Sequence, residues 1–595
     1  MTARRPVRIA NCSGFYGDRI AAARDMVEGG PIDVLTGDYL AELTMLILWK
    51  ARQKDPSAGY ARTFLTQMEQ VLGTCLDRGI RIVTNAGGLN PAGLAFELAE
   101  LSDRLGLAPH ISYVHGDDIV DRIPELVAEG HGLANIDTHQ TLADSGAKPV
   151  TANAYLGGWG IAEALTAGAD IVVCPRVTDA SLVVGPAAWW HQWKRTDYDA
   201  LAGAVAAGHV IECGPQATGG NYSWLSEVTD RRRPGYPIAE VAQDGSSVIT
   251  KHDGTGGLVS PGTVTAQLLY EIGAPAYANP DVVAHFDTVS LTQKGPDRVL
   301  ISGATGSPPP PDLKVAVNFL GGYRNTMTLV LTGLDIEEKA AWARAQLFEI
   351  LGGEDRFDDV DVRLLRFDQD DAPTNEQATA HLRITVKDPD RTKVGRRFAN
   401  ATMELFLGGY AGFHTTTPPT AESAYGVYWP ALVPVESVSH RVVLPDGTEH
   451  VVPHGATAPL PVRPAAPATE VPDEPTRRVP LGRICASRSG DKGGNANIGL
   501  WTRDERSFDW MWAHLTEDRL RELVPEAAGL AVHRWALPNL HAMNFVIVGL
   551  LGSGVAASPR PDPQAKGLGE YVRSRHVDIP ISLLDDTQEA RPWTQ

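Results

Sequence analysis

The chain has 595 residues, of which 43% are hydrophobic and 21% charged, and its formal net charge is -19. A chain of this length exceeds the size of one hydrophobic core, so we expect two to four domains. The acidic balance argues against general nucleic-acid binding, because no cationic surface would offset the repulsion from phosphates.

Residues 1–311 alternate between short apolar runs and amphipathic stretches. The apolar runs predict β-strands at residues 7–10, 33–36, 80–84, 110–114, 170–174 and 210–213. The amphipathic stretches predict helices at residues 39–50, 63–77 and 92–105. Strands that alternate with helices are typical of βα units, so we expect an α/β domain with a mostly parallel sheet flanked by helices. An open sheet and a barrel both fit this pattern, and we favour the open sheet.

Glycine-rich loops follow these strands. The first, residues 11–19 (NCSGFYGDR), could point backbone N–H groups at an anion, although a plain βα turn is the alternative. It fits a dinucleotide fingerprint only loosely, so we expect no nicotinamide cofactor. Because the carboxyl ends of parallel strands meet in one crevice, the later loops are expected to share a substrate site with it. The predicted binding residues in these loops are Gly14, Asp18, Asp38, Asn85, Gly87 and Gly88.

Four side chains in these loops are candidates for catalysis. Asp117 and Asp118 are adjacent, and two buried carboxylates repel each other, which raises one pKa into a useful range. Asp179 offers a further acid or base, and Arg176 could hold a carboxylate or thioester oxygen. With His115, the two adjacent aspartates could instead bind a divalent metal ion, or one of them could cap a helix. The sequence leaves the metal open.

Two more glycine-rich segments lie near the end of this domain. Cys213, in residues 212–220 (ECGPQATGG), would be a nucleophile only if a base or helix dipole activated it; otherwise it is a buried thiol. Residues 251–257 (KHDGTGG) form a flexible loop that could bind an anion. The predicted binding residues here are Gln216, Gly219, Gly220, Lys251, Gly256 and Gly257.

Residues 312–452 have a different order of elements. Two strands and a helix are expected twice, at residues 313–319, 327–331 and 336–351, then at 360–366, 380–386 and 394–407. This order is typical of a smaller α+β layer. Residues 453–480 include eight prolines in 28 positions and predict an extended linker.

The last segment, residues 481–595, predicts a separate C-terminal α+β domain, with strands at residues 482–486, 496–501, 531–536 and 545–551. Between its first two predicted strands lie residues 487–497 (SRSGDKGGNAN), where Arg488 and Lys492 flank glycines. Such a cluster suits a phosphate, a carboxylate or the pyrophosphate of CoA, and its alternative is a solvated, charged hairpin. The predicted binding residues are Arg488, Asp491, Lys492 and Asn497.

Taken together and in this order, these motifs resemble the acyclic terpene utilisation (AtuA-like) family with its C-terminal companion domain. The resemblance covers most of residues 6–455 and 480–580. It is carried by the segments NCSGFYGDR, LTGDYLAELTM, TNAGGLNP, HGDDI, NAYLGGWGIAEALTAGADIVVCPRVTDASL, IECGPQATGG, KHDGTGG and SRSGDKGGNANIG. This chain departs from the family at Pro175, where glycine is usual, and at Gly494, where aspartate is usual. The resemblance implies breakdown of branched terpenoid acids through CoA thioesters.

Two classes of function are consistent with these observations. The first is a lyase or hydro-lyase that acts on a branched acyl-CoA or hydroxy acid, with Asp117, Asp118 and Asp179 as acid/base groups and Arg176 as the oxyanion holder. The second is a non-catalytic subunit that binds or scaffolds a CoA ester for a partner enzyme. We favour the first, with a small-molecule substrate and no cofactor assigned except an optional divalent metal.

The cysteine pattern and the chain ends bear on location and assembly. The five cysteines are scattered without a C-x-x-C pair, which is typical of free thiols in a reducing compartment. We see no signal peptide and no apolar run near the roughly 20 residues that span a bilayer, so a cytoplasmic protein without membrane partners is expected. Large α/β enzymes are commonly symmetric oligomers. We therefore predict a homo-oligomer with Trp189, Trp190 and Trp193 partly at its interface; packing within one chain is the alternative.

Overall fold

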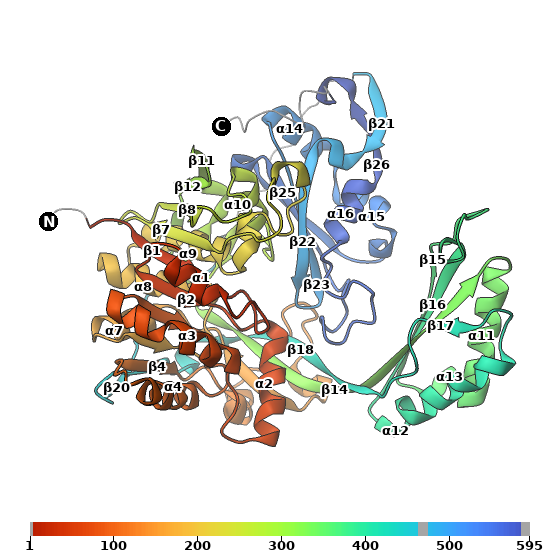
Figure 1. Cartoon of the computed structure of the whole chain (residues 1–595), viewed down its shortest axis with the longest axis horizontal. Helices are drawn as coiled ribbons and strands as arrows, with labels where there is room; N and C mark the ends of the chain where they lie inside the picture. The colour runs from red at the N-terminus through yellow and green to blue at the C-terminus, as the bar shows by residue number, and fades with distance from the viewer. Residues whose placement is uncertain (1–3, 462–473, 585–595) are drawn as a thin grey trace. The chain divides into compact units, whose positions relative to one another are not determined.

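The computed structural model describes residues 4–461 and 474–584 (Figure 1). Two compact units are present: Met1–Asn318 with Tyr428–Val555 and Asp562–Gln595, and Phe319–Val427 with Ala556–Pro561. The predicted boundaries at 311/312, 452/453 and 480/481 stay predictions, and residues 462–473 of the predicted linker lie outside the described residues. None of the described helices is both long enough and apolar enough to cross a membrane.

A mixed sheet forms the centre of the first unit. Its eleven strands, counted over the described residues, run in the order β11-β12-β8-β7-β1-β2-β3-β6-β4-β19-β20. The five central strands are parallel, as the βα pattern predicts: β1 (Val7–Asn11), β2 (Val34–Gly37), β3 (Arg81–Thr84), β6 (Ile171–Val173) and β4 (Ile111–His115). Antiparallel strands extend both edges: β7 (Pro237–Val241), β8 (Ser247–Lys251), β12 (Arg298–Ser302), β11 (Ser290–Gly295), β19 (Arg441–Val443) and β20 (Glu449–Val451).

Helices pack on this sheet in two groups. The first group contacts Leu35 and Ile82 of the sheet and consists of α1 (Ala22–Glu28), α3 (Arg62–Arg78) and α4 (Pro91–Leu105). The second group packs as a separate layer and consists of α7 (Trp159–Thr166), α8 (Ser181–His191) and α9 (Tyr198–Ile211). Between β2 and β3 the chain also forms α2 (Glu42–Lys54). The predicted α/β fold class is confirmed, with the parallel pairing confined to the centre of the sheet.

The strand predicted at residues 210–213 is wrong. Residues 210–211 end α9, and Cys213 begins the turn before η2 (Gly214–Thr218). All of α9 from Ala200 to Ile211 is buried. A helix that is buried on every side is apolar on every side, so it lacks the amphipathic period that identifies surface helices. Its last apolar residues were therefore read as a short strand.

The second unit contains both helices and strands, as expected of a smaller α+β layer, but its bounds differ from the predicted 312–452. Its sheet contains β15 (Asp359–Arg366), β16 (Thr379–Asp388) and part of β14 (Asp312–Thr332), and it carries α11 (Ile336–Leu351) and α13 (Arg396–Gly408). β14 is one strand of 21 residues, where two strands were predicted. Gly321 and Gly322 lie between the two predicted strands, and the positive φ of Gly322, 127°, is accommodated within the continuous strand.

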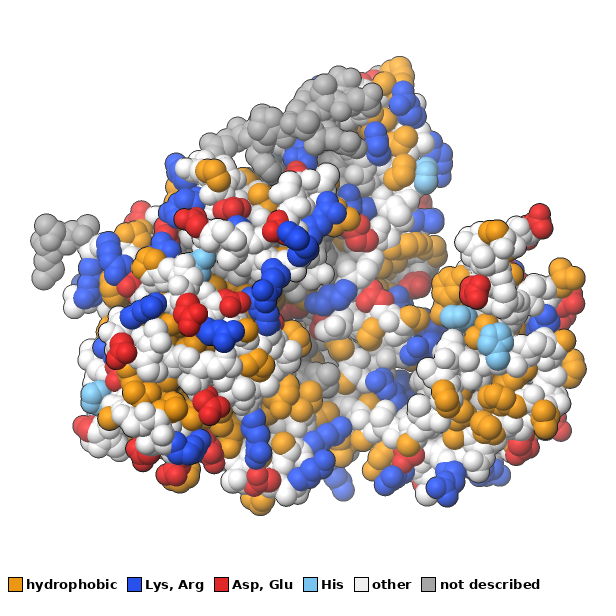
Figure 2. Space-filling model, in the orientation of Figure 1, with side chains coloured by type: hydrophobic (Ala, Val, Ile, Leu, Met, Phe, Trp, Pro, Cys, Tyr) orange, Lys and Arg blue, Asp and Glu red, His pale blue; other side chains and the backbone are white. Residues whose placement is uncertain are grey.

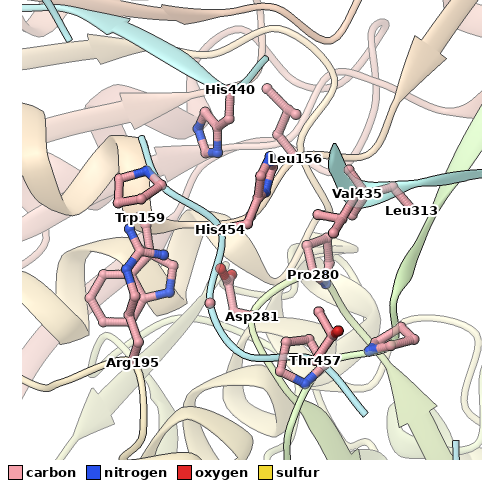
Figure 3. A pocket seen from close by; sticks show the side chains of 15 residues that line it. Leu156, Trp159, Arg195, Pro280, Asp281, Leu313, Val435, His440, His454 and Thr457 are labelled. Atoms are coloured by element: carbon pink, nitrogen blue, oxygen red, sulfur yellow. The ribbon is translucent and has the colours of Figure 1, made fainter. Parts of the chain in front are cut away.

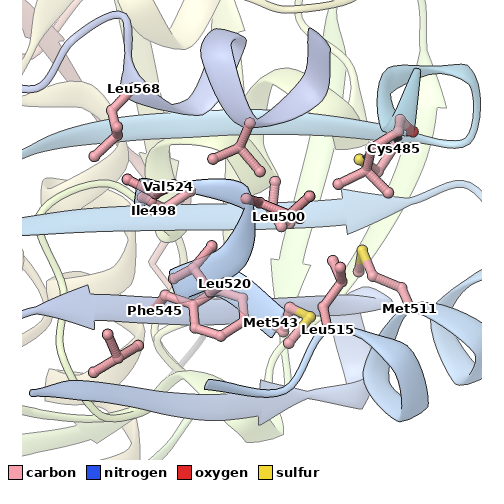
Figure 4. Close-up of a cluster of buried hydrophobic side chains, with 14 of the residues drawn as sticks. Cys485, Ile498, Leu500, Met511, Leu515, Leu520, Val524, Met543, Phe545 and Leu568 are labelled. Carbon is pink, nitrogen blue, oxygen red and sulfur yellow. Dashed lines mark hydrogen bonds between the residues drawn. The ribbon is translucent and has the colours of Figure 1, made fainter. Parts of the chain in front are cut away.

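The C-terminal region forms its own antiparallel sheet in the order β22 (Cys485–Lys492), β23 (Asn495–Thr502), β25 (Ala542–Ile547) and β24 (Val532–Leu537). Its helices are α14 (Glu505–His514), α15 (Glu517–Leu523) and α16 (Leu568–Ser574). Leu500, Met511 and Phe545 lie in its apolar core, which Figure 4 shows between sheet and helices. The predicted loop at residues 487–497 is wrong: these residues belong to β22 and β23, and Gly493 and Gly494 form the turn between them.

Candidate active site

The loops at the carboxyl ends of the parallel strands meet, as their placement predicts. Asn85, after β3, donates through Nδ2 to Oδ1 of Asp38, after β2, at 2.6 Å. Asp117, after β4, accepts the backbone N–H of Arg176, after β6, at 3.2 Å. Oδ2 of Asp117 also accepts from Asn153 Nδ2 at 2.8 Å. Residues from four strands are thus joined by hydrogen bonds at one edge of the sheet.

Arg176 is at the centre of this arrangement. Its Nη2 pairs with Oδ1 of Asp179 at 2.6 Å, and its Nη1 donates to the carbonyl of Leu40 at 2.5 Å. The guanidinium lies over the ring of Tyr155, 4.3 Å from its centroid. The buried Nε has no hydrogen-bond partner among the described residues. A buried donor without a partner is costly in a folded protein.

Two more carboxyl groups lie near this ion pair. Burial raises the pKa of Asp38 well above its usual range, and the charge of Asp179 raises it further. Burial also raises the pKa of Glu212, which follows α9, and the charges of Asp179 and Glu271 add to the effect. Asp38 and Glu212 are therefore carboxyl groups whose protonated form is favoured, beside the Arg176–Asp179 ion pair. We call Asp38, Arg176, Asp179 and Glu212 the carboxylate cluster. Strongly perturbed carboxyl groups gathered at one place are typical of active sites.

His209 packs beside Glu212 in α9. Its Nδ1 lies 3.2 Å from Glu212 Oε1, without the alignment of a hydrogen bond. Burial lowers the pKa of His209 to about 4, so the ring is neutral. The ring centroids of Tyr277 and Phe286 lie 5.0 and 5.5 Å from it. Aromatic rings thus pack against His209, next to Glu212 of the carboxylate cluster.

The adjacent aspartates that the sequence pairs as acid and base are separated in the structure. Asp117 is buried, and burial together with the charge of Asp118 raises its pKa to about 7. Asp118 is exposed and accepts the N–H of Val120 at 3.1 Å. The helix-cap alternative is wrong, because Ile119 is the N-cap residue of the short helix that follows. His115 faces Glu449 at 3.1 Å. Within the described part of the chain, no group of three or more His, Cys, Asp or Glu side chains is placed to hold a metal ion.

The glycine-rich loops use their N–H groups within the protein. Gly14 donates to Oδ2 of Asp18 at 2.8 Å, so an internal carboxylate occupies the anion position of the first loop. Gly87 and Gly88 donate to the carbonyls of Cys174 and Asn85 at 3.1 and 3.2 Å. The N–H groups of Gly220 and Gly257 also donate to backbone carbonyls. Gly219 ends η2 in the left-handed conformation, and the carbonyl of Gly256 accepts the N–H of Gly235.

Lys251 is also engaged within the protein. Its Nζ lies 2.9 Å from Asp297 Oδ2 and donates to the carbonyl of Thr255 at 2.9 Å. Its charge is therefore compensated by a carboxylate of the turn between β11 and β12. Cys213 is a thiol whose pKa is raised well above its usual range by burial and by Glu212, so its environment disfavours a nucleophilic thiolate.

The cations of the C-terminal sheet bind the first domain. Arg488, only 5% exposed, donates from Nη2 to Gln216 Oε1 and stacks 4.1 Å from the centroid of Tyr270. Lys492 donates to the carbonyl of Glu271 at 2.8 Å, and Asn497 accepts the N–H of the same residue at 2.9 Å. Asp491 lies half-buried in the same hairpin. The cluster is therefore a docking contact and not a solvated hairpin.

Several residues of this region escaped sequence reasoning. Glu212 and His209 were missed because their helix was read as a strand. Once α9 is recognised, their spacing of three places them on one helical face. Tyr277 had no sequence signal, because only folding brings it beside His209.

Comparison with known families agrees with this architecture. The model of the acyclic terpene utilisation family protein AtuA matches residues 7–444, and the model of the AtuA ferredoxin-like domain matches residues 479–578. The second match covers the C-terminal sheet. No curated protein matches the chain.

Proposed function

The chain belongs to the acyclic terpene utilisation family AtuA, and from this premise we propose that it is a lyase or hydro-lyase of branched-acid breakdown. Its substrate would be an acyl-CoA ester or a hydroxy acid. The observation that carries the proposal is the carboxylate cluster: Asp179, paired with Arg176, lies near two buried carboxyl groups, Asp38 and Glu212, whose pKa values are raised by burial. Elimination of water needs such a combination of base and acid.

In the proposed reaction a 3-hydroxyacyl substrate loses water. Asp179 takes the proton from the carbon next to the carbonyl, and that electron pair becomes the carbon–carbon double bond as the C3–O bond breaks. Glu212 gives its proton to the departing hydroxyl, which leaves as water. The unpartnered Nε–H of Arg176 donates to the carbonyl oxygen, where negative charge develops. Return of the proton from Asp179 to Glu212 restores both groups.

Other predicted residues receive different roles. Asp117 is a positioning residue, because it binds the backbone of Arg176 and the side chain of Asn153. Asp118 is exposed, so we no longer propose it as an acid or base. Arg488 and Lys492 are proposed to fix the C-terminal domain beside Gln216 and Glu271, not to bind the acyl chain directly.

A panel of branched enoyl-CoA and 3-hydroxyacyl-CoA esters, analysed by mass spectrometry with divalent ions present and absent, tests the proposal. We expect at least one ester to gain or lose the mass of water. If folded protein binds an ester but converts none of the panel, the non-catalytic binding or scaffolding subunit is the better account.

We also propose a homo-oligomer, but with a different interface from the predicted tryptophan segment. Trp190 Nε1 donates to the carbonyl of Arg5 at 3.0 Å, and Trp193 Nε1 donates to that of Gln243 at 2.8 Å. These bonds support packing within the chain. On the second unit, by contrast, α11 and α13 expose Trp342, Met403, Phe406 and Leu407, and Figure 2 shows hydrophobic side chains on this unit's surface.

A further inference from the structure

A second candidate site is a pocket lined in part by the loop that follows β5 (Pro149–Ala154). Tyr155 of this loop contacts Arg176, whereas Leu156 and Gly157 line a pocket whose empty volume, mouth included, is about 420 Å³. Figure 3 shows Arg195, Asp281, His440 and His454 around it. None of these side chains belongs to the carboxylate cluster.

Arg195 is the cation of this pocket. Its guanidinium stacks on Trp159, 4.6 Å from a ring centroid, and it forms no hydrogen bond or ion pair with the residues that the structure describes. Burial lowers its pKa from the usual value. The carboxylates of Asp281 and Glu163 act on it only through their charge, so its N–H groups stay available to an anion from solution.

His440 is a second group without a partner. It is only 6% exposed, and its Nε2 makes no hydrogen bond within residues 4–461 and 474–584. Burial lowers its pKa to about 3, so the ring is neutral. Nε2 faces Gly160, so Nδ1 is the nitrogen left to donate to a ligand. His454, on the segment that crosses the pocket, is already bonded to the carbonyl of Val438 at 2.9 Å.

The remaining walls restrict the ligand. Asp281 accepts the N–H of Gly158 at 2.7 Å, and burial raises its pKa to about 6, so a ligand with two negative charges is repelled more strongly than a ligand with one. The other walls are largely apolar and consist of Leu156, Trp159, Pro280, Pro309, Pro310, Leu313 and Val435. A ligand with one negative charge and a short hydrocarbon end fits these groups better than phosphate.

We propose that this pocket binds a small aliphatic monocarboxylate, whose carboxylate pairs with Arg195 and accepts from His440. Its alkyl end packs against Leu156 and Leu313. The inference does not depend on the proposed reaction, because the two sites share no polar side chain. They are nevertheless joined, since the N–H of Leu156 donates to the carbonyl of Arg176 at 3.1 Å.

The test is a saturation-transfer NMR titration of the full chain with sodium 3-methylbutanoate. We expect Arg195→Gln to weaken binding at least tenfold and Arg195→Lys to weaken it less, because lysine keeps the charge but loses the planar fork. Arg24→Gln, an exposed arginine on α1, is the matched control and should bind as the wild type does. Inorganic phosphate should compete only weakly.

Three results would overturn the proposal: no binding of the acid, equal affinity in Arg195→Gln, or stronger binding of phosphate than of the acid. Loss of affinity in Arg488→Ala with none in Arg195→Gln would place the acid elsewhere.

A crystal grown with 3-bromopropanoate provides a check that needs no variant. We expect its bromine signal in the pocket beside Leu313, and bromine found only at other positions would refute the site. A negative binding result with the acid does not bear on turnover of the acyl-CoA panel, so the two proposals can be refuted independently.

Discussion

Asp117 makes the stability of the chain depend on pH. Its folded pKa is about 7, whereas an unfolded aspartate titrates near about 3.9. The folded chain therefore holds an extra proton between these values. The resulting stabilisation is complete below pH ~4 and is lost as the pH rises through 7. We predict that Asp117→Asn raises the thermal midpoint relative to wild type at pH 7.5 but not at pH 4. The corresponding gain in the free energy of unfolding is at most about 4 kcal/mol.

Asp118→Asn is the matched control for this measurement. Its side chain is exposed, and its charge is a secondary cause of the raised pKa of Asp117. The pH-dependent loss of stability should remain in this variant and move to lower pH. A difference between Asp117→Asn and wild type that is constant from pH 4 to 7.5 would contradict the burial of an ionisable carboxyl group.

At the residue level, sequence reasoning found the polar groups that directly follow the strands. Asp38, Asn85, Asp117, Arg176 and Asp179 were all predicted from their positions after strands, and the structure brings them together. Their exact roles could not be predicted, because burial separates Asp117 from its exposed neighbour. Glu212 required knowledge of α9, and the partner of Arg488 depended on contacts more than 200 residues apart in the chain.

The approach of β22 and β23 to Leu269 and Tyr270, which directly follow α10 (Pro261–Leu268), depends on glycine. A Cβ atom at Gly499 would lie 2.5 Å from Cβ of Leu269, and one at Gly490 would lie 2.3 Å from the ring of Tyr270. We predict that Gly499→Val separates these elements and lowers the thermal midpoint, with a cost of about 1–3 kcal/mol for overpacking. Limited proteolysis should also cut the C-terminal domain faster in this variant.

Gly529→Val is the control, because a Cβ atom there meets nothing within 4 Å. It should leave both the midpoint and the cleavage rate unchanged. Equal behaviour of the two variants would show that close approach of β23 to Leu269 does not hold the C-terminal domain in place.

Among the elements, amphipathic helices and isolated strands were predicted best. The helix at residues 336–351 was predicted with the bounds of α11, because its pattern has a clear helical period. Errors occurred where the local signal is ambiguous. The buried α9 has no polar face, and the glycine pair in β14 is typical of turns although the strand continues through it.

For the whole molecule, the exposed face of α11 and α13 predicts self-association. Light scattering should give a multiple of the chain mass of 63.9 kDa. Leu407→Glu, at the most exposed of these side chains, should lower that mass, while Leu225→Glu, at another exposed leucine, should not. A wild-type monomer at micromolar concentration would refute the homo-oligomer.

The separate C-terminal domain was accessible to sequence reasoning, and a family model of its own matches residues 479–578. The contacts that hold the C-terminal sheet in place could not be predicted, because they are scattered along the chain. Ser223 Oγ donates to the carbonyl of Ser487 at 2.7 Å, and Asn544 donates to the carbonyl of Gly273 at 2.8 Å. Such isolated polar pairs leave no pattern that sequence periodicity can reveal.

The most direct test of the account is exchange of the substrate's α-proton with deuterated water, followed by mass spectrometry of a branched 3-hydroxyacyl-CoA or enoyl-CoA. We predict a gain of deuterium next to the carbonyl with the wild type. Asp179→Asn should lose this exchange by at least about 100-fold, the scale of general-base catalysis, while ester affinity is retained. Undiminished exchange in Asp179→Asn, or none with the wild type while the ester is bound, would contradict the proposed role of the carboxylate cluster.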